Sequence, residues 1–67
     1  MTVNETLAFY RKLRKLSQRQ LGEMIGYEGK VAKRMIQSYE YKQRPIPAKN
    51  IRKLANALDI PVDKLVP

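Results

Sequence analysis

The chemistry most available to this chain is that of cations and amides, because Cys and His, which supply thiolate and imidazole groups for catalysis and metal binding, are missing. Its 67 residues include 14 Lys and Arg and 6 Asp and Glu, but neither Cys nor His. Thiolate or imidazole metal sites, disulfides, and Cys-His or Ser-His catalysis are therefore excluded. The acidic residues show no pairing typical of an acid/base couple. We expect no enzyme activity, no cofactor and no metal site.

The basic residues are concentrated in the middle of the chain. Thirteen bases and three acids lie between Arg11 and Lys53, a net charge of +10 within a chain of net charge +8. A basic block with slightly acidic ends is the electrostatic pattern expected of a polyanion binder. A solvated surface is the alternative interpretation, and a membrane-binding amphipathic helix is disfavoured because the apolar residues are sparse within each segment.

One segment combines this charge with side chains that can recognise nucleic-acid bases. A helix over about residues 31–40 is predicted from the apolar stripe formed by Val31, Met35, Ile36 and Tyr39. Its other faces carry Lys33, Arg34, Gln37 and Ser38. Arg and Lys can donate to the acceptor pair of guanine, and Gln matches the donor and acceptor of adenine. An ordinary solvated helix face is the alternative for these residues.

Two further helices are predicted before this segment. Thr2 and Glu5 have the spacing of a capping box, which predicts a helix from near Val3 to near Lys15. Its apolar stripe comprises Leu7, Tyr10 and Leu13. Ser17 is the expected N-cap of a short helix that ends at Met24, followed by Gly26 in a left-handed stop. Gly22 inside this helix costs about 1 kcal/mol relative to Ala, which indicates a close backbone neighbour.

The rest of the chain is predicted to contain two connections and one more long helix. Residues 27–30 are expected to form a loop, and the prolines of segment 43–47 exclude a helix there. Pro47 is the expected first residue of a fourth helix, with Ile51, Leu54, Ala55 and Leu58 on its apolar face. A final helical turn over 62–66 carries Leu65. We therefore expect one all-α domain over residues 1–67, a compact bundle of four to five short helices.

A short helix, a tight link and a second helix with polar and basic residues opposite its apolar stripe are typical of a helix-turn-helix. The residues that sharpen this pattern occur in order as Arg11, Leu16-Ser17-Gln18, Leu21, Gly26, Ile36 and Tyr39-Glu40, then Pro47 and the segment 51–60. Over about residues 5–66 the chain resembles the lambda-repressor-like, Xre-type helix-turn-helix DNA-binding family. The resemblance implies a recognition helix at about 31–40 that lies in the DNA major groove.

The resemblance also implies roles for individual residues. The positions from which family members contact base edges are Lys33, Arg34, Gln37 and Ser38. Phosphate contacts are implied for Gln18 at the start of the second helix, and expected for Lys30, Lys42, Gln43 and Arg44. Arg11 and Glu40 are the implied partners of a partly buried ion pair that ties the first helix to the end of the third. The cations Arg14, Lys15, Lys49, Arg52 and Lys53 are expected on solvated faces.

The sequence departs from the family pattern in three places. Tyr27 to Lys30 lengthen the usual turn by about four residues, which leaves open where the recognition helix starts and which of Lys30, Lys33 and Arg34 faces the groove. Gly22 stands where Ala is usual. Lys42 stands where Gly is frequent, and the loop that follows is about one residue longer.

These observations predict a sequence-specific regulator of transcription that binds double-stranded DNA, with repression as the favoured activity. We expect a cytoplasmic, nucleoid-associated protein that binds an inverted-repeat operator as a weak homodimer or as a dimer formed on DNA. The alternative is an antitoxin or restriction-system controller module, which binds both DNA and a protein partner.

Overall fold

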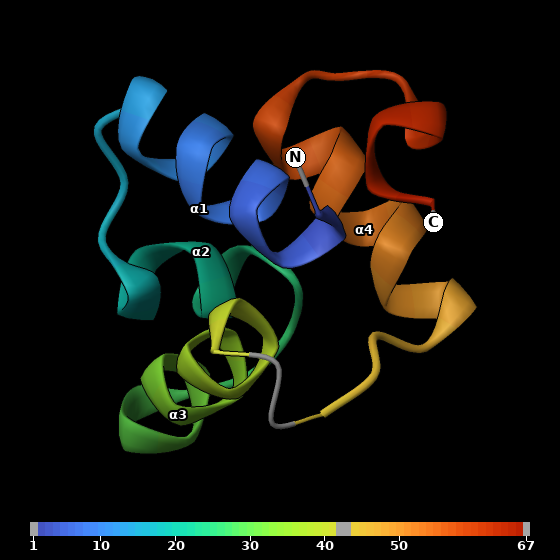
Figure 1. Ribbon diagram of the computed structural model, residues 1–67. Helices are drawn as coiled ribbons and strands as arrows, with labels where there is room; N and C mark the ends of the chain where they lie inside the picture. Colours follow the sequence, from blue (N-terminus) through green and yellow to red (C-terminus); the bar gives the residue numbers. More distant parts are fainter. Residues whose placement is uncertain (1, 42–43, 67) are drawn as a thin grey trace.

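The computed structural model describes residues 2–41 and 44–66, which form four α-helices and a closing 3-10 helix (Figure 1). The helices are α1 (Val3–Leu13), α2 (Gln18–Met24), α3 (Gly29–Glu40), α4 (Ala48–Leu58) and η1 (Val62–Leu65). These two stretches contain no strand, so the all-α prediction is confirmed. Among the described helices, none is long and apolar enough to cross a membrane.

The first two helices begin where local sequence chemistry places them. Thr2 Oγ1 accepts a hydrogen bond from the Glu5 amide at 3.2 Å, and Glu5 Oε1 accepts one from the Thr2 amide at 3.0 Å. Ser17 and Gln20 form the same reciprocal box at 2.9 and 2.8 Å. Each box satisfies amides that have no partner inside the helix. The first helix ends at Leu13 and not near Lys15, whose φ of 58° is left-handed.

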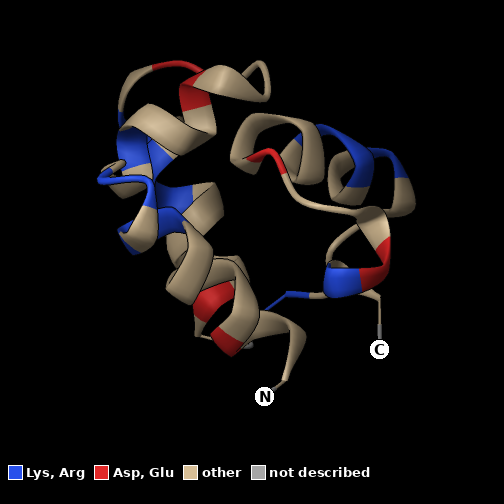
Figure 2. Ribbon diagram, turned by 90° about the horizontal axis from the view of Figure 1, so that it is seen from above, with Lys and Arg blue, Asp and Glu red and all other residues tan. Residues whose placement is uncertain are grey.

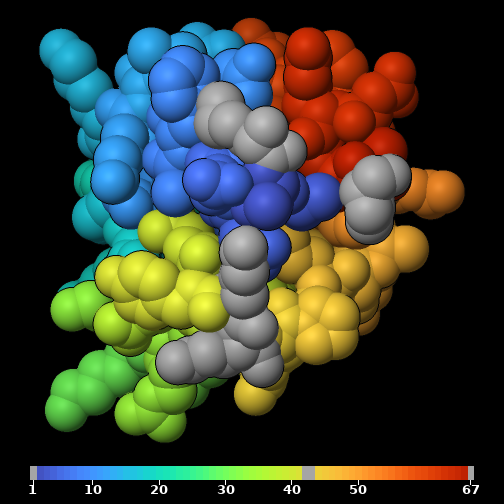
Figure 3. Space-filling model, in the orientation of Figure 1, coloured from blue at the N-terminus to red at the C-terminus, as the bar shows by residue number. Residues whose placement is uncertain are grey.

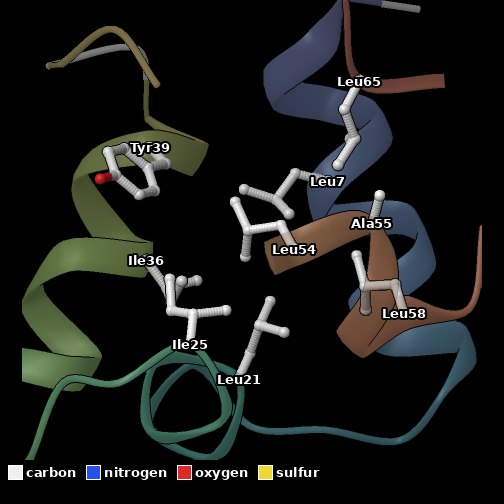
Figure 4. Packing of buried hydrophobic residues seen from close by; sticks show 9 residues of the cluster. All are labelled: Leu7, Leu21, Ile25, Ile36, Tyr39, Leu54, Ala55, Leu58 and Leu65. Atoms are coloured by element: carbon white, nitrogen blue, oxygen red, sulfur yellow. The ribbon is translucent and has the colours of Figure 1, made fainter. Parts of the chain in front are cut away.

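All five elements contribute side chains to a single core. In Figure 4 these side chains converge from the surrounding helices on one interior. The buried cluster comprises Leu7, Leu21, Ile25, Ile36, Tyr39, Leu54, Ala55, Leu58 and Leu65. The described residues measure 28 × 23 × 20 Å, so almost every helix reaches both the core and the surface.

Two residues expected in apolar stripes are exposed instead. Leu13 is 58% exposed, because the inward-facing side of α1 carries Leu7 and, four residues later, Arg11. Val31 is 52% exposed, whereas its neighbour Ala32 is fully buried. The inward stripe of α3 is Ala32, Ile36 and Tyr39, and the helix begins at Gly29, two residues earlier than predicted.

The close approach expected at Gly22 is confirmed. A Cβ atom on Gly22 would lie 2.3 Å from the backbone oxygen of Ala32. Real side chains do not tolerate such a contact, so α2 and α3 touch through their backbones. Gly26, after α2, has a φ of 106°, which confirms the left-handed stop.

Both ends of α4 differ from the sequence-based expectation. Pro47 is the N-cap and not the first helical residue, since its carbonyl oxygen accepts the first bonds of the helix, from Asn50 at 2.9 Å and Ile51 at 3.0 Å. At the other end, Arg14 Nε donates to the Leu58 carbonyl at 2.9 Å and Nη2 to the Asp59 carbonyl at 3.4 Å. Arg14 therefore caps α4 and is not simply a solvated cation.

Candidate nucleic-acid interface

The outer face of α3 brings most of the predicted base-contacting residues together. Because Ala32, Ile36 and Tyr39 point inward, the opposite face of the helix carries the polar side chains. In Figure 3 α3 forms the lower-left edge of the molecule, and its side chains extend outward from that edge. A hollow of about 320 Å³ is lined by Lys30, Lys33, Arg34 and Gln37. Ser38 is half-buried.

Lys30 is placed differently from the sequence-based expectation. It is the second residue of α3 and not part of a loop, and it lies one helical turn before Arg34. The lengthened turn therefore contributes its last two residues, Gly29 and Lys30, to the helix. Lys30, Lys33 and Arg34 all line the same hollow.

Two other residues expected to contact phosphates, Gln18 and Arg44, are not part of the lining of this hollow. Gln18 Nε2 donates to Glu40 Oε1 at 3.1 Å, so its side chain joins α2 to the end of α3. Arg44 is exposed, and its Nη1 lies 3.3 Å from Met35 Sδ beside α3. Lys42 and Gln43 lie outside the described residues.

An ion pair fixes the far end of α3. Arg11 Nε lies 2.6 Å from Glu40 Oε2, and Arg11 Nη2 donates to Glu40 Oε1 at 3.2 Å. The third nitrogen, Nη1, donates to the Leu16 carbonyl at 2.8 Å. Only 11% of the Arg11 side chain and 5% of the Glu40 side chain are exposed. The pair therefore holds α1, the link after it and the end of α3 together.

A buried asparagine, which the sequence reasoning missed, holds α3 from the opposite side. Asn50 Nδ2 donates to Tyr39 Oη at 2.8 Å and to Tyr27 Oη at 3.1 Å. The hydrogen bond from Asn50 lowers the pKa of Tyr27, whereas burial raises the pKa of Tyr39. Asn4 Nδ2 adds a bond to the Tyr39 carbonyl. The available signal was spacing, because Asn50 precedes Leu54 and Leu58 at four-residue steps on the apolar face of α4.

The outer face of α3 is positively charged. Figure 2 shows basic residues on several helices and only a few, separated acidic ones. The ion pairs seen among residues 2–41 and 44–66 join Arg11 to Glu40 and Arg19 to Glu23, and neither involves the outer face of α3. The cations there remain available to an anionic partner. Guanidinium, ammonium and amide groups in one hollow can donate to phosphate oxygens and to base edges.

The short α2, the turn after it and α3 with its polar outer face define a helix-turn-helix. The family described as Helix-turn-helix, of the Cro/C1 and Xre-like type, matches residues 7–65. The chain belongs to this family of DNA-binding regulators. Comparisons with curated proteins and with solved structures gave no match.

Proposed function

We propose that this protein regulates transcription, as a repressor, by binding specific sequences in double-stranded DNA with α3 in the major groove. The observation that carries the proposal is the hollow on the outer face of α3, where three cations and an amide gather and no ion pair with a carboxylate is formed among residues 2–41 and 44–66. A helix fits the width of the major groove, and each base pair presents a distinct set of donors and acceptors there.

The contacts divide by the chemistry of the side chains. Arg34 and Gln37 are the principal base readers, because each can form two hydrogen bonds with one base, guanine and adenine respectively. Lys33 and Ser38 add contacts at the edges of the face. Backbone phosphates are bound by Gln18, Lys30, Lys42, Gln43 and Arg44. For Gln18 the donor is the backbone amide in the first turn of α2, because its side chain is bound to Glu40.

The position of α3 is fixed before DNA binds. The Arg11–Glu40 pair holds its end, Gly22 sets its distance from α2, and Asn50 joins Tyr39 to α4. A rigid support of this kind keeps donors within the narrow tolerances that base recognition needs. The protein therefore acts by binding, with the fold serving to aim one helix.

Two copies of the protein bind one operator. Each copy presents one recognition helix, and two-fold symmetry would place the two helices about 34 to 36 Å apart, one turn of B-DNA. The matching operator is an inverted repeat, and the dimer forms weakly or on the DNA itself. A protein with this activity acts in the cytoplasm, where it is associated with the nucleoid.

Selection of bound duplexes from a random pool tests the proposal. We expect enrichment of an inverted repeat. The logarithm of the affinity for this duplex should fall linearly with the logarithm of the salt concentration. Lys53→Ala, which removes an exposed cation from α4, should enrich the same sequence. Recovery of no preferred sequence would contradict the proposal. A stoichiometric protein partner that co-purifies while DNA binding persists would identify an antitoxin or controller module.

A further inference from the structure

Val31 occupies an unexpected position on the recognition helix. It is the third residue of α3, and its side chain is 52% exposed, although its spacing relative to Met35 had suggested a core position. Successive residues of a helix are about 100° apart. Val31 therefore lies at the edge of the outer face, three residues before Arg34 and seven before Ser38.

An isolated exposed apolar side chain is ordinary on a protein surface, but Val31 lies where, in the proposed function, the recognition helix meets DNA. Residues at the beginning of the recognition helix contact base edges in helix-turn-helix complexes, and Val31 is in the first turn of α3. A β-branched residue is also a poorer helix former than Ala. Here no core contact compensates for that disadvantage, because the adjacent Ala32 takes the buried position.

The chemistry of an aliphatic side chain in the major groove is specific. Valine has no donor or acceptor, and the one apolar group that a base pair presents in this groove is the C5 methyl of thymine. Lys33, Arg34 and Gln37 cannot detect that methyl by hydrogen bonding. Val31 and Arg34 are separated by about 4.5 Å along the helix axis, slightly more than one base-pair step.

We infer that Val31 reads the methyl group of a thymine that lies within two base pairs of the base contacted by Arg34. The inference rests on the proposed function and adds one position to the sequence that α3 recognises. The recognised half-site then combines a purine bound through hydrogen bonds with a thymine bound through an apolar contact.

Replacement of thymine by deoxyuridine tests this contact, because it removes the methyl and nothing else. The probe is the duplex selected by the wild-type protein, with each thymine of one half-site replaced in turn. We expect about a fourfold loss of affinity at one position, the effect of burying a single methyl group. Val31→Ala should bind the thymine and deoxyuridine duplexes equally, and its circular dichroism should match that of the wild type.

Met24→Ala provides the matched control, because Met24 is 55% exposed but lies on α2. It should keep the wild-type ratio between the thymine and deoxyuridine duplexes. The inference is overturned if no deoxyuridine duplex binds more weakly, or if Val31→Ala still discriminates fourfold. A selection that yields no preferred sequence contradicts the proposed function itself, which distinguishes that failure from a wrong assignment of Val31.

Discussion

Gly22 and Ala32 lie so close that a Cβ on the glycine would be 2.3 Å from the alanine's carbonyl oxygen. This contact joins the two helices of the helix-turn-helix through their backbones. It also explains why a residue that disfavours helices stands inside α2. The glycine lets α3 approach α2 closely, and Ala32 is fully buried.

Gly22→Ala should therefore destabilise the protein. Alanine gains about 1 kcal/mol of helix propensity, but the clash is with backbone, which cannot move without shifting α3. We expect a net loss of about 1 to 2 kcal/mol in the free energy of unfolding measured with urea. Met24→Ala, on the same helix, should change it by less than about 0.5 kcal/mol. A Gly22→Ala protein more stable than the wild type would show that the helices do not touch there.

Removal of only one partner of the Arg11–Glu40 pair should strongly destabilise the protein. Arg11→Met leaves the Glu40 carboxylate buried without its cation, and we expect a loss of about 3 to 5 kcal/mol. The double variant Arg11→Met with Glu40→Leu should recover most of that loss, because no charge is then left buried. Thermal or urea unfolding measures the free energy of unfolding of the single and the double variant.

The other ion pair found within the described part of the chain offers a matched comparison. Arg19 and Glu23 are also in contact, at 3.3 Å, but their side chains are 63% and 44% exposed. Arg19→Ala should change stability by no more than about 0.5 kcal/mol. Equal effects at the buried and exposed pairs would contradict the role assigned to Arg11 and Glu40.

The two tyrosines bound to Asn50 should ionise in a fixed order. The pKa of Tyr27 is lowered from 10.0 by the bond from Asn50, so its contribution to stability is present above pH 10 and is lost as the pH falls through the folded pKa. Burial raises the pKa of Tyr39, so its contribution is present below pH 10 and is lost as the pH rises through the folded pKa. Tyrosine ring NMR should show Tyr27 ionising first.

Asn50→Leu tests whether the bonds from Asn50 set these two pKa values. The bond from Asn50 lowers the pKa of both tyrosines, so its removal should raise both midpoints. Asn56→Leu, at an exposed position of the same helix, should leave both unchanged. Unchanged midpoints of Tyr27 and Tyr39 in Asn50→Leu would mean that Asn50 does not bond to them in solution.

Arg14→Ala should loosen the end of α4. The guanidinium bonds to the Leu58 and Asp59 carbonyls are lost, and we expect a decrease of about 1 kcal/mol in unfolding free energy. Arg14→Lys should not restore it, because an ammonium lacks the fork of donors that reaches two carbonyls. Lys12→Ala, which removes an exposed cation from the last turn of α1, serves as the control. Equal stability of the Arg14 and Lys12 variants would contradict the capping role.

Features governed by near neighbours could be predicted from the sequence. The capping boxes of Thr2 and Ser17 and the left-handed Gly26 each depend on residues no more than a few positions away. The four helices and the helix-turn-helix family followed from these signals and from the spacing of apolar residues. Most of the polar face of α3 was found in the same way.

The family resemblance implied the distant Arg11–Glu40 pair, but other features that depend on distant partners were missed. Ala32 and not its neighbour Val31 faces inward, where the backbones of α2 and α3 meet at Gly22, a contact between residues ten positions apart. The lengthened turn also obscured the start of α3 in the sequence. The capping role of Arg14 could not be predicted, because the carbonyl groups that accept its hydrogen bonds lie more than forty positions later in the sequence. Asn50 was overlooked because a polar residue on an apolar stripe has meaning only once its tyrosine partners are known.

We propose that the outer face of α3 reads base sequence, and Arg34→Ala tests this proposal most directly. The measurement is the affinity of wild type, Arg34→Ala and Lys53→Ala for the selected duplex and for single-base variants of it, over a range of salt concentrations. We predict that Arg34→Ala loses about tenfold or more in affinity, together with the preference at one base pair, while Lys53→Ala keeps that preference. An Arg34→Ala protein with unchanged affinity and unchanged base preference would contradict the account.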